Sequence, residues 1–253
     1  MKKKVKQLLG FLFGNKRINL KMIHGLYKGI NLNVCIKNQL GIILYPNEIH
    51  LQDFLKNNLD YGDIAFDIGS NIGYTSILTS QLVGDTGHVY SFEPINETYL
   101  ILEKNIHLNN CKNITIMNYA ISNKNGKVEF NIPDNGENFS MSSMVWGKDS
   151  DNNKKQVVKT IKIDDDINFK NLSPKIIKID VEGAEGLVLD GMQKLISRCK
   201  PYLFIECTNI GREMTWSILK SLNYSCFKSG NIKDEIIDFN LYRHNDFIWS
   251  ANK

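Results

Sequence analysis

The chain has 253 residues, of which 42% are hydrophobic and 23% charged, a globular composition with enough length for one sizeable core. Six of its 31 lysines and arginines lie in the first 17 residues, which hold no acid; the rest carries 25 cations and 27 acids, a net of −2. A body that is not basic argues against a nucleic-acid-binding protein. The lack of a 20-residue apolar run argues against a transmembrane helix.

The first residues predict an amphipathic helix. Val5, Leu8, Leu9, Leu12 and Phe13 recur at helical spacing, with lysines between them. Two arrangements are compatible with this pattern. The favoured one is a helix docked on the protein's own body, or a frayed terminus. The alternative is a helix on an anionic membrane surface, which would give weak peripheral contact through residues 1–17 at the inner face of the membrane.

Residues 1–45 are expected to form an N-terminal extension, with short strands between Lys21 and Cys35, and residues 46–253 one domain that begins with a helix at Pro46–Leu59. From Gly62 onward, strand-like segments alternate with helical ones of 10 to 15 residues. This alternation predicts crossover units and a mostly parallel, doubly wound α/β sheet. Gly126–Ile132 and Gln156–Ile163 predict an inserted antiparallel pair. The polar stretch 133–155 between them is long enough to predict a lid or binding loop.

The five cysteines form no CxxC pair and are expected to be reduced thiols of a cytoplasmic protein. Neither the cysteines nor the five histidines form a metal-binding pattern, so no metal ligand is assigned.

A glycine-spaced turn, "DIGSNIG", follows the first alternating strand and predicts a ligand site. Ligands of open parallel sheets bind at the carboxyl ends of the strands, and glycines let the backbone approach a ligand closely. The next strand ends in "FEP", where the Glu93 carboxylate can accept hydrogen bonds from both hydroxyls of a ribose. The combination predicts a nucleoside cradle.

The spacing of the glycines separates the candidate nucleoside cofactors. A dinucleotide fingerprint starting at Gly69 needs glycines at 71 and 74, where the chain has Asn71 and Tyr74. This disfavours a dehydrogenase. No GK[ST] follows the turn, so a P-loop is excluded as well. Asp67, directly before the turn, suits a cationic ligand better than a pyrophosphate, and S-adenosylmethionine fits that requirement.

The motifs together resemble a known family. "FDIGSNIGYTSI", "VYSFEP", "NYAISNKNGKVEF", "TIKIDDD", "IKIDVEGAE" and "PYLFIEC" occur in the order and spacing of the FkbM-type methyltransferases, over about residues 45 to 210. The resemblance implies the class I, Rossmann-like methyltransferase fold with a seven-stranded sheet. It also implies S-adenosylmethionine as cofactor and O-methylation of a hydroxyl on a sugar, a glycan or a secondary metabolite. The first 40 residues and the 133–155 loop match no family pattern, and the sequence does not indicate an oligomeric state.

Carried over to this chain, the family pattern assigns two groups of site residues. The cofactor-binding group comprises Asp67, Gly69, Ser70, Asn71 and Gly73 in the turn, Glu93 and Pro94 after the second strand, and Asn118 and Ala120 along the adenine. The catalytic group comprises Asp180 and Glu182, at the end of the fourth strand beside the methyl group.

Alternation along "KIDVEG" places Lys178 and Asp180 on one face of the strand, with Glu182 just beyond it. One carboxylate can act as a general base, while the other orients the acceptor or the amino group of the cofactor. A divalent cation between them is a less favoured alternative. Glu185 is expected to cap a helix. Glu206 either faces the cleft or caps the next helix.

Two further classes share the fold. Amino-methylating nucleic-acid enzymes carry [DN]PP[YF] where this chain has "DVEG", and cytosine C5 enzymes need a cysteine that is absent between Cys111 and Cys199. A non-catalytic nucleoside-binding protein is the other alternative, and it is disfavoured because Asp67, Glu93 and Asp180 are all present.

Overall fold

The computed structural model describes residues 16–45, 48–133, 153–242 and 245–251. The expected helix near the N-terminus and most of the 133–155 loop lie outside these residues. No helix in the described ranges is long and apolar enough to cross a membrane.

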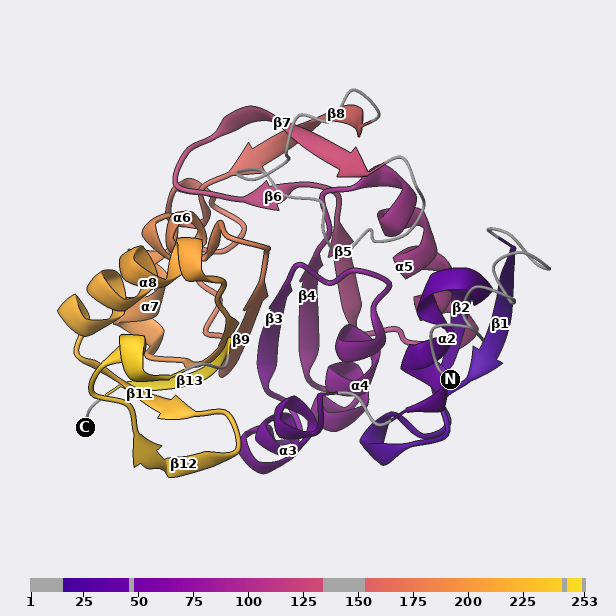
Figure 1. The fold of residues 1–253 in the computed structure, drawn as a ribbon, viewed down its shortest axis with the longest axis horizontal. Helices are drawn as coiled ribbons and strands as arrows, with labels where there is room; N and C mark the ends of the chain where they lie inside the picture. Colours follow the sequence, from indigo (N-terminus) through magenta and orange to yellow (C-terminus); the bar gives the residue numbers. More distant parts are fainter. Residues whose placement is uncertain (1–15, 46–47, 134–152, 243–244, 252–253) are drawn as a thin grey trace.

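A mostly parallel sheet forms the centre of the molecule (Figure 1). Its eight strands run in the order β12-β11-β13-β10-β9-β3-β4-β5. Strands β5, β4, β3, β9 and β10 are parallel, whereas β13 is antiparallel to both β10 and β11. The expected seven strands are therefore confirmed, and β12 adds an eighth at the edge of the sheet. The strands span Ile64–Ile68 (β3), His88–Phe92 (β4), Ile114–Met117 (β5), Ile176–Asp180 (β9), Tyr202–Glu206 (β10), Tyr224–Lys228 (β11), Asn231–Glu235 (β12) and Asp246–Ala251 (β13).

Helices cover both faces of the sheet because the central strands are apolar on both sides. In β3, Ala65 packs into the core under α3, α4 and α5, while Phe66 packs into the core under α6, α7 and α8. The same alternation separates Ile176 from Ile177 in β9. The predicted doubly wound architecture is thus confirmed (Figure 1). The helices span Ile49–Asn58 (α3), Tyr74–Val83 (α4), Asn96–Leu108 (α5), Glu185–Asp190 (α6), Gln193–Cys199 (α7) and Asn209–Ser221 (α8).

The N-terminal region packs against α5. Strands β1 (Arg17–Lys21) and β2 (Asn31–Cys35) pair antiparallel around the short helix η1 (Gly25–Tyr27). Helix α2 (Ile36–Leu44) follows and is not predicted from the sequence. Its buried Ile36 and Ile43 lie at helical spacing, but three isoleucines and Gly41 give it a weak helical signal.

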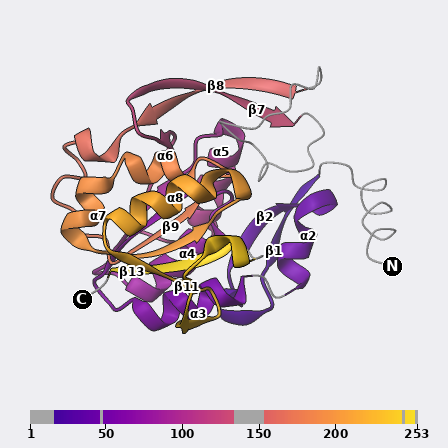
Figure 2. The same ribbon diagram turned by 60° about the vertical axis from the view of Figure 1, so that its left-hand side comes forward.

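A second, three-stranded sheet of order β6-β8-β7 lies above the central one in both views (Figures 1 and 2). It contains β6 (Ala120–Ile121), β7 (Gly126–Pro133) and β8 (Asn153–Ile161). The predicted antiparallel pair is confirmed as β7 and β8. One predicted strand, "NITIMNYA", is divided, because β5 ends at Met117 and β6 joins β8 in the second sheet. The remaining short helices are η3 (Ile163–Asp165) and η4 (Phe239–Leu241).

Candidate active site

The turn after β3 has a backbone that requires glycine at two positions. Gly69 (φ 81°), Asn71 (φ 50°) and Gly73 (φ 90°) all have left-handed conformations. A Cβ added to Gly69 would lie 1.8 Å from the carbonyl oxygen of Asp180, and one added to Gly73 would lie 2.3 Å from Cδ1 of Leu102. The turn therefore packs directly against the end of β9 and against α5.

Hydrogen bonds fix this turn to the neighbouring strand. The backbone N–H groups of Gly69 and Ser70 both donate to the carbonyl oxygen of Phe92, at 3.0 Å. The Ser70 hydroxyl donates to the carbonyl oxygen of Asp67 at 2.7 Å. Ser70 is buried and is not among the residues that line the pocket, so its part in the site is to hold the turn.

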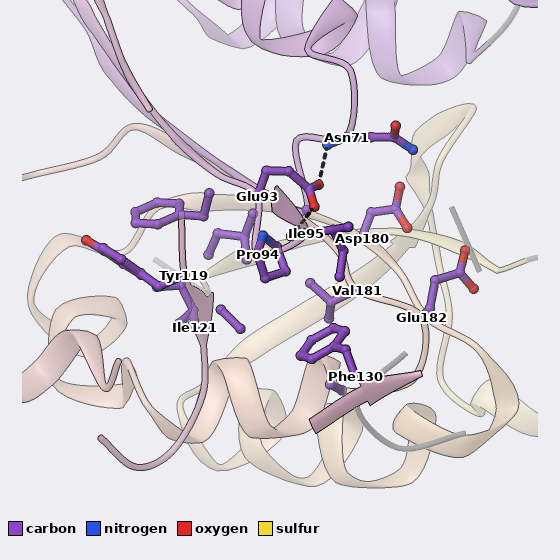
Figure 3. A pocket seen from close by; sticks show the side chains of 15 residues that line it. Asn71, Glu93, Pro94, Ile95, Tyr119, Ile121, Phe130, Asp180, Val181 and Glu182 are labelled. Atoms are coloured by element: carbon purple, nitrogen blue, oxygen red, sulfur yellow. Dashed lines mark hydrogen bonds between the residues drawn. The ribbon is translucent and has the colours of Figure 1, made fainter. Parts of the chain in front are cut away.

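Glu93 lies directly opposite the turn. One carboxyl oxygen accepts the N–H of Asn71 and the other accepts the N–H of Ile95, both at 2.9 Å (Figure 3). The side chain is 6% exposed. Burial raises the pKa of Glu93 to about 7, although the two N–H donors favour the ionised form. Each oxygen keeps a free lone pair, which is what the proposed contact with ribose hydroxyls requires.

Asn118 bonds the backbone beside the pocket and does not line it, and its predicted place along the adenine stays a prediction. Its side-chain amide donates to the carbonyl oxygens of Glu93 and Pro94, at 3.0 and 3.2 Å. It thereby fixes the backbone that carries Glu93, while Pro94 and Ala120 line the pocket themselves.

One pocket brings together seven of the predicted residues, from β3, β4, β6 and β9 (Figure 3). They are Gly69, Asn71, Glu93, Pro94, Ala120, Asp180 and Glu182. Tyr119 and Ile121 lie on one side, and Asp180 and Glu182 on the other (Figure 3). Four predicted residues do not line the pocket: Asp67, Ser70, Gly73 and Asn118.

The apolar part of the pocket was missed by the sequence reasoning. Phe130 comes from β7, and Tyr119, Ile121, Ile95 and Val181 complete the surface. The alternation of Val128, Phe130 and Ile132 was an available signal, because it shows that one face of the inserted hairpin is buried. An aromatic and aliphatic wall of this kind suits the flat face of an adenine.

Lys178, on β9, joins the glycine turn to the end of that strand. It lies opposite Asp67 in the register of β9 with β3. Its Nζ is 3.6 Å from Oδ1 of Asp67 and 3.2 Å from Oδ2 of Asp180, and it donates to the carbonyl oxygen of Gly69 at 3.2 Å. Burial alone would lower the pKa of Lys178, but the carboxylates of Asp180, Asp67 and Glu48 outweigh it and raise that pKa. Lys178 is therefore charged.

Asp67 is 2% exposed, and its other oxygen accepts the hydroxyl of Ser76. Its charge is thus directed at Lys178 in the structure, and its predicted role toward the cations of a cofactor stays a prediction.

Three carboxyl groups gather at the carboxyl ends of β9 and β10. Glu206 pairs in register with Asp180, and Glu182 follows in a left-handed turn with φ 52°. Burial and the charge of Asp180 raise the pKa of Glu182 to about 7. Burial and the charges of Asp180 and Asp246 raise that of Glu206 to about 8. Among the described residues, neither Glu182 nor Glu206 has a hydrogen-bond or ion-pair partner, so the capping alternative for Glu206 finds no support here.

Glu185 lies in the first turn of α6, where the sequence predicted an acid, and bonds the backbone just before that helix. It is fully buried, and its Oε1 accepts the N–H of Gly183 at 2.7 Å. Glu48 is a further carboxylate that the sequence reasoning missed. It accepts hydrogen bonds from the hydroxyls of Tyr74 and Tyr27, and burial raises its pKa.

The donor set fits S-adenosylmethionine better than a metal ion. The pocket combines an apolar wall, a carboxylate opposite a glycine turn, and two carboxylates at the far side. The side-chain oxygen of Asn71 is also buried without a hydrogen-bond partner and is available to a ligand. In the part of the chain that the structure describes, no group of three or more histidines, cysteines and acids could hold a metal ion.

The sheet order and this site define the class I, S-adenosylmethionine-dependent methyltransferases. The chain belongs to one family within that class: the model of the methyltransferase FkbM domain matches residues 67–239. The expected family and its cofactor are thereby confirmed.

Solved structures share the fold, and a curated protein matches a short part of the sequence. Methyltransferase FkbM from Methylobacillus flagellatus is similar with a TM-score of 0.50 and 18% identity, over 76% of this chain and 44% of that one. A proposed rRNA methylase from Clostridium thermocellum is similar with a TM-score of 0.51 and 11% identity, over 87% of this chain and 99% of that one. Protein-L-isoaspartate O-methyltransferase from Fervidobacterium nodosum is 39% identical over 56 residues, which are 22% of this chain and 28% of that protein. The chain thus spans less than half of the FkbM chain and less than a third of this curated relative.

Proposed function

We propose that this protein transfers the methyl group of S-adenosylmethionine to a hydroxyl group on a sugar, a glycan or a secondary metabolite. One observation carries the proposal: the glycine turn with Glu93 and the end of β9 with Asp180 and Glu182 line the same pocket. One side of this pocket suits a nucleoside, and the other offers carboxylates to an acceptor.

The cofactor, when bound, supplies a methyl group on a sulfonium, which is already a good leaving group. The chain therefore has to position an acceptor, exclude water and remove one proton. Gly69 lets the backbone come close, Glu93 accepts the ribose hydroxyls, and the wall of Tyr119, Ile121 and Phe130 covers the adenine. Asp180 and Glu182 remain the proposed catalytic residues.

The carboxylates differ in what they can do with the proton of the acceptor. One oxygen of Asp180 is bound by Lys178, which leaves the other to orient the hydroxyl. Glu182 has a pKa of about 7 and Glu206 one of about 8, close to the pH at which a general base is most effective. We therefore assign orientation to Asp180 and proton removal to Glu182 or Glu206.

The charge of this region supports a neutral acceptor. Glu48, Asp180, Glu182 and Glu206 lie near a single buried lysine. That lysine, Lys178, is already paired with Asp67 and Asp180, so a phosphate or carboxylate on the acceptor would gain little from its charge. The same argument disfavours nucleic acid, whose affinity comes largely from its phosphates.

The test is transfer of a ¹³C-methyl group from labelled S-adenosylmethionine. A panel of neutral monosaccharides, uronic acids and a short RNA is offered to the wild type and to Asp180→Asn. The expected product is an O-methyl sugar, with a rate that falls about 10²-fold in Asp180→Asn, because the acceptor hydroxyl loses the carboxylate that orients it. Glu213→Gln, on the outer part of α8, is the control and should keep the rate. Label on the RNA alone would contradict the proposal.

A further inference from the structure

A buried side chain on α5 links the N-terminal region to the cofactor turn by hydrogen bonds. The family match begins at residue 67, so β1 and β2 lie outside it. Nevertheless β2 packs along α5, and α5 also contacts the glycine turn through Leu102. The helix thus stands between the two segments (Figure 1).

Asn105, on α5, makes a hydrogen bond in each direction. Its Nδ2 donates to the carbonyl oxygen of Ile72, inside the turn, at 2.7 Å. Its Oδ1 accepts the backbone N–H of Asn33, in β2, also at 2.7 Å. The side chain is completely buried, so water cannot replace either partner.

Ile72 lies at a point of the turn where a change in backbone orientation would alter the cofactor site. It lies between Asn71 and Gly73, which both have left-handed backbones. The N–H of Asn71 is the group that donates to Glu93. The peptide that carries the carbonyl of Ile72 donates its N–H, that of Gly73, to the carbonyl oxygen of Ser70 at 2.9 Å, and this carbonyl shares a peptide with the N–H of Asn71. A bond that holds the carbonyl of Ile72 therefore supports, through this second bond, the peptide that contacts Glu93.

We propose that Asn105 is a positioning residue that couples β2 to the glycine turn, which makes the N-terminal strands a working part of the cofactor site. The inference rests on the proposed function, because it assumes that the turn binds S-adenosylmethionine.

Asn109 provides a matched control. It lies one helical turn further along α5 and bonds the same strand, accepting the N–H of Asn31 at 2.9 Å and donating to its carbonyl oxygen at 2.8 Å. Among the described residues it makes no hydrogen bond to the glycine turn. Asn109→Ala therefore weakens the attachment of β2 to α5 and leaves the bond to Ile72 in place. Asn105→Ala removes both the bond to Ile72 and the bond to Asn33.

The experiment measures three quantities for the wild type, Asn105→Ala and Asn109→Ala. They are the free energy of unfolding in urea, the calorimetric Kd of S-adenosylhomocysteine, and the hydrogen exchange of the Asn33 amide with and without that ligand. Both variants should be less stable than the wild type. Only Asn105→Ala should raise the Kd, by about tenfold, since one buried hydrogen bond contributes on this scale. The ligand should slow exchange at Asn33 in the wild type and in Asn109→Ala only.

An equal change of Kd in both variants would overturn the inference, because the effect would then be general destabilisation. The inference would also be overturned if S-adenosylhomocysteine did not change the hydrogen exchange rate of the Asn33 amide in the wild type. If the wild type binds S-adenosylhomocysteine and Asn105→Ala binds it equally well, this inference alone fails. If the wild type does not bind it, the proposed function fails too.

Discussion

The backbone of Gly69 lies against the backbone of Asp180, so closely that a Cβ on Gly69 would be 1.8 Å from the Asp180 carbonyl oxygen. The glycine turn and the end of β9 therefore share a close backbone contact.

Gly69→Ala is expected to destabilise the protein by more than the left-handed backbone alone explains. That strain is worth about 1–2 kcal/mol for a residue with a Cβ. Gly29→Ala is the matched control, because Gly29 has φ 101° but a Cβ there would meet nothing within 4 Å. Urea unfolding should show the larger loss for Gly69→Ala, together with lost binding of S-adenosylhomocysteine. Equal losses for the two variants would show that the contact with Asp180 can relax.

The affinity for S-adenosylhomocysteine should depend on pH through Glu93. Its pKa is about 7 before binding. Hydroxyl donors on the ribose favour the ionised carboxylate, so the pKa falls on binding and affinity rises with pH up to about 7. Calorimetry from pH 5.5 to 8 should show this rise in the wild type and a flatter, weaker profile in Glu93→Gln. Glu182→Gln is measured in parallel, since that pKa is also about 7. If the rise of affinity with pH persists in Glu93→Gln and disappears in Glu182→Gln, the group that loses its proton on binding is Glu182 and not Glu93.

Glu206 should make the wild type lose stability, relative to Glu206→Gln, as the pH rises. In the unfolded chain its carboxyl ionises near pH 4.5, whereas in the folded protein it keeps its proton up to about 8. The unfolded state then binds fewer protons between these values, so the free energy of unfolding decreases with pH. Urea titrations at pH 5 and pH 8 measure the difference. If the gap between wild type and variant is constant across this range, Glu206 is more solvated than the structure indicates.

Lys178→Met should be strongly destabilising. It leaves the carboxylate of Asp67, whose side chain is 3% exposed, without its cation. Breaking a buried pair in this way costs about 3–5 kcal/mol. The double variant Asp67→Asn with Lys178→Met should recover part of the loss, and a double-mutant cycle by urea unfolding measures the recovery. Strict additivity of the two single changes would mean that the pair is not coupled.

Much of the fold followed from local patterns. The alternation of short apolar runs with helical segments after Gly62 predicted the parallel strands and their helices, because both faces of β3 and β9 are apolar. Helix α2 was not predicted because its intrinsic helix propensity is low, so that its structure depends on packing against the rest of the protein. Strand β12 was missed as well, since "NIKDE" offers no apolar face and depends on its partner β11.

The site was predictable where chemistry demands a residue type, and less so where it depends on tertiary contacts. Gly69 and Glu93 carry their signal in the sequence itself. The pairing of Asp67 with Lys178 depends on which strands are neighbours, and the bonds of Asn118 depend on where β5 ends. Phe130 reaches the site from the inserted hairpin and Asn105 reaches the turn from the buried face of α5, and nothing in the spacing of the motifs pointed to them.

The central claim is that the turn after β3 and Glu93 hold S-adenosylmethionine. Calorimetric titration of the purified protein with S-adenosylmethionine, S-adenosylhomocysteine and NAD tests it most directly. The structure predicts one site per chain for the first two ligands, no measurable heat with NAD, and at least tenfold weaker binding of S-adenosylhomocysteine to Glu93→Ala, because charge-assisted hydrogen bonds are worth about 1.5–3 kcal/mol each. Binding of NAD without binding of S-adenosylmethionine would contradict the account.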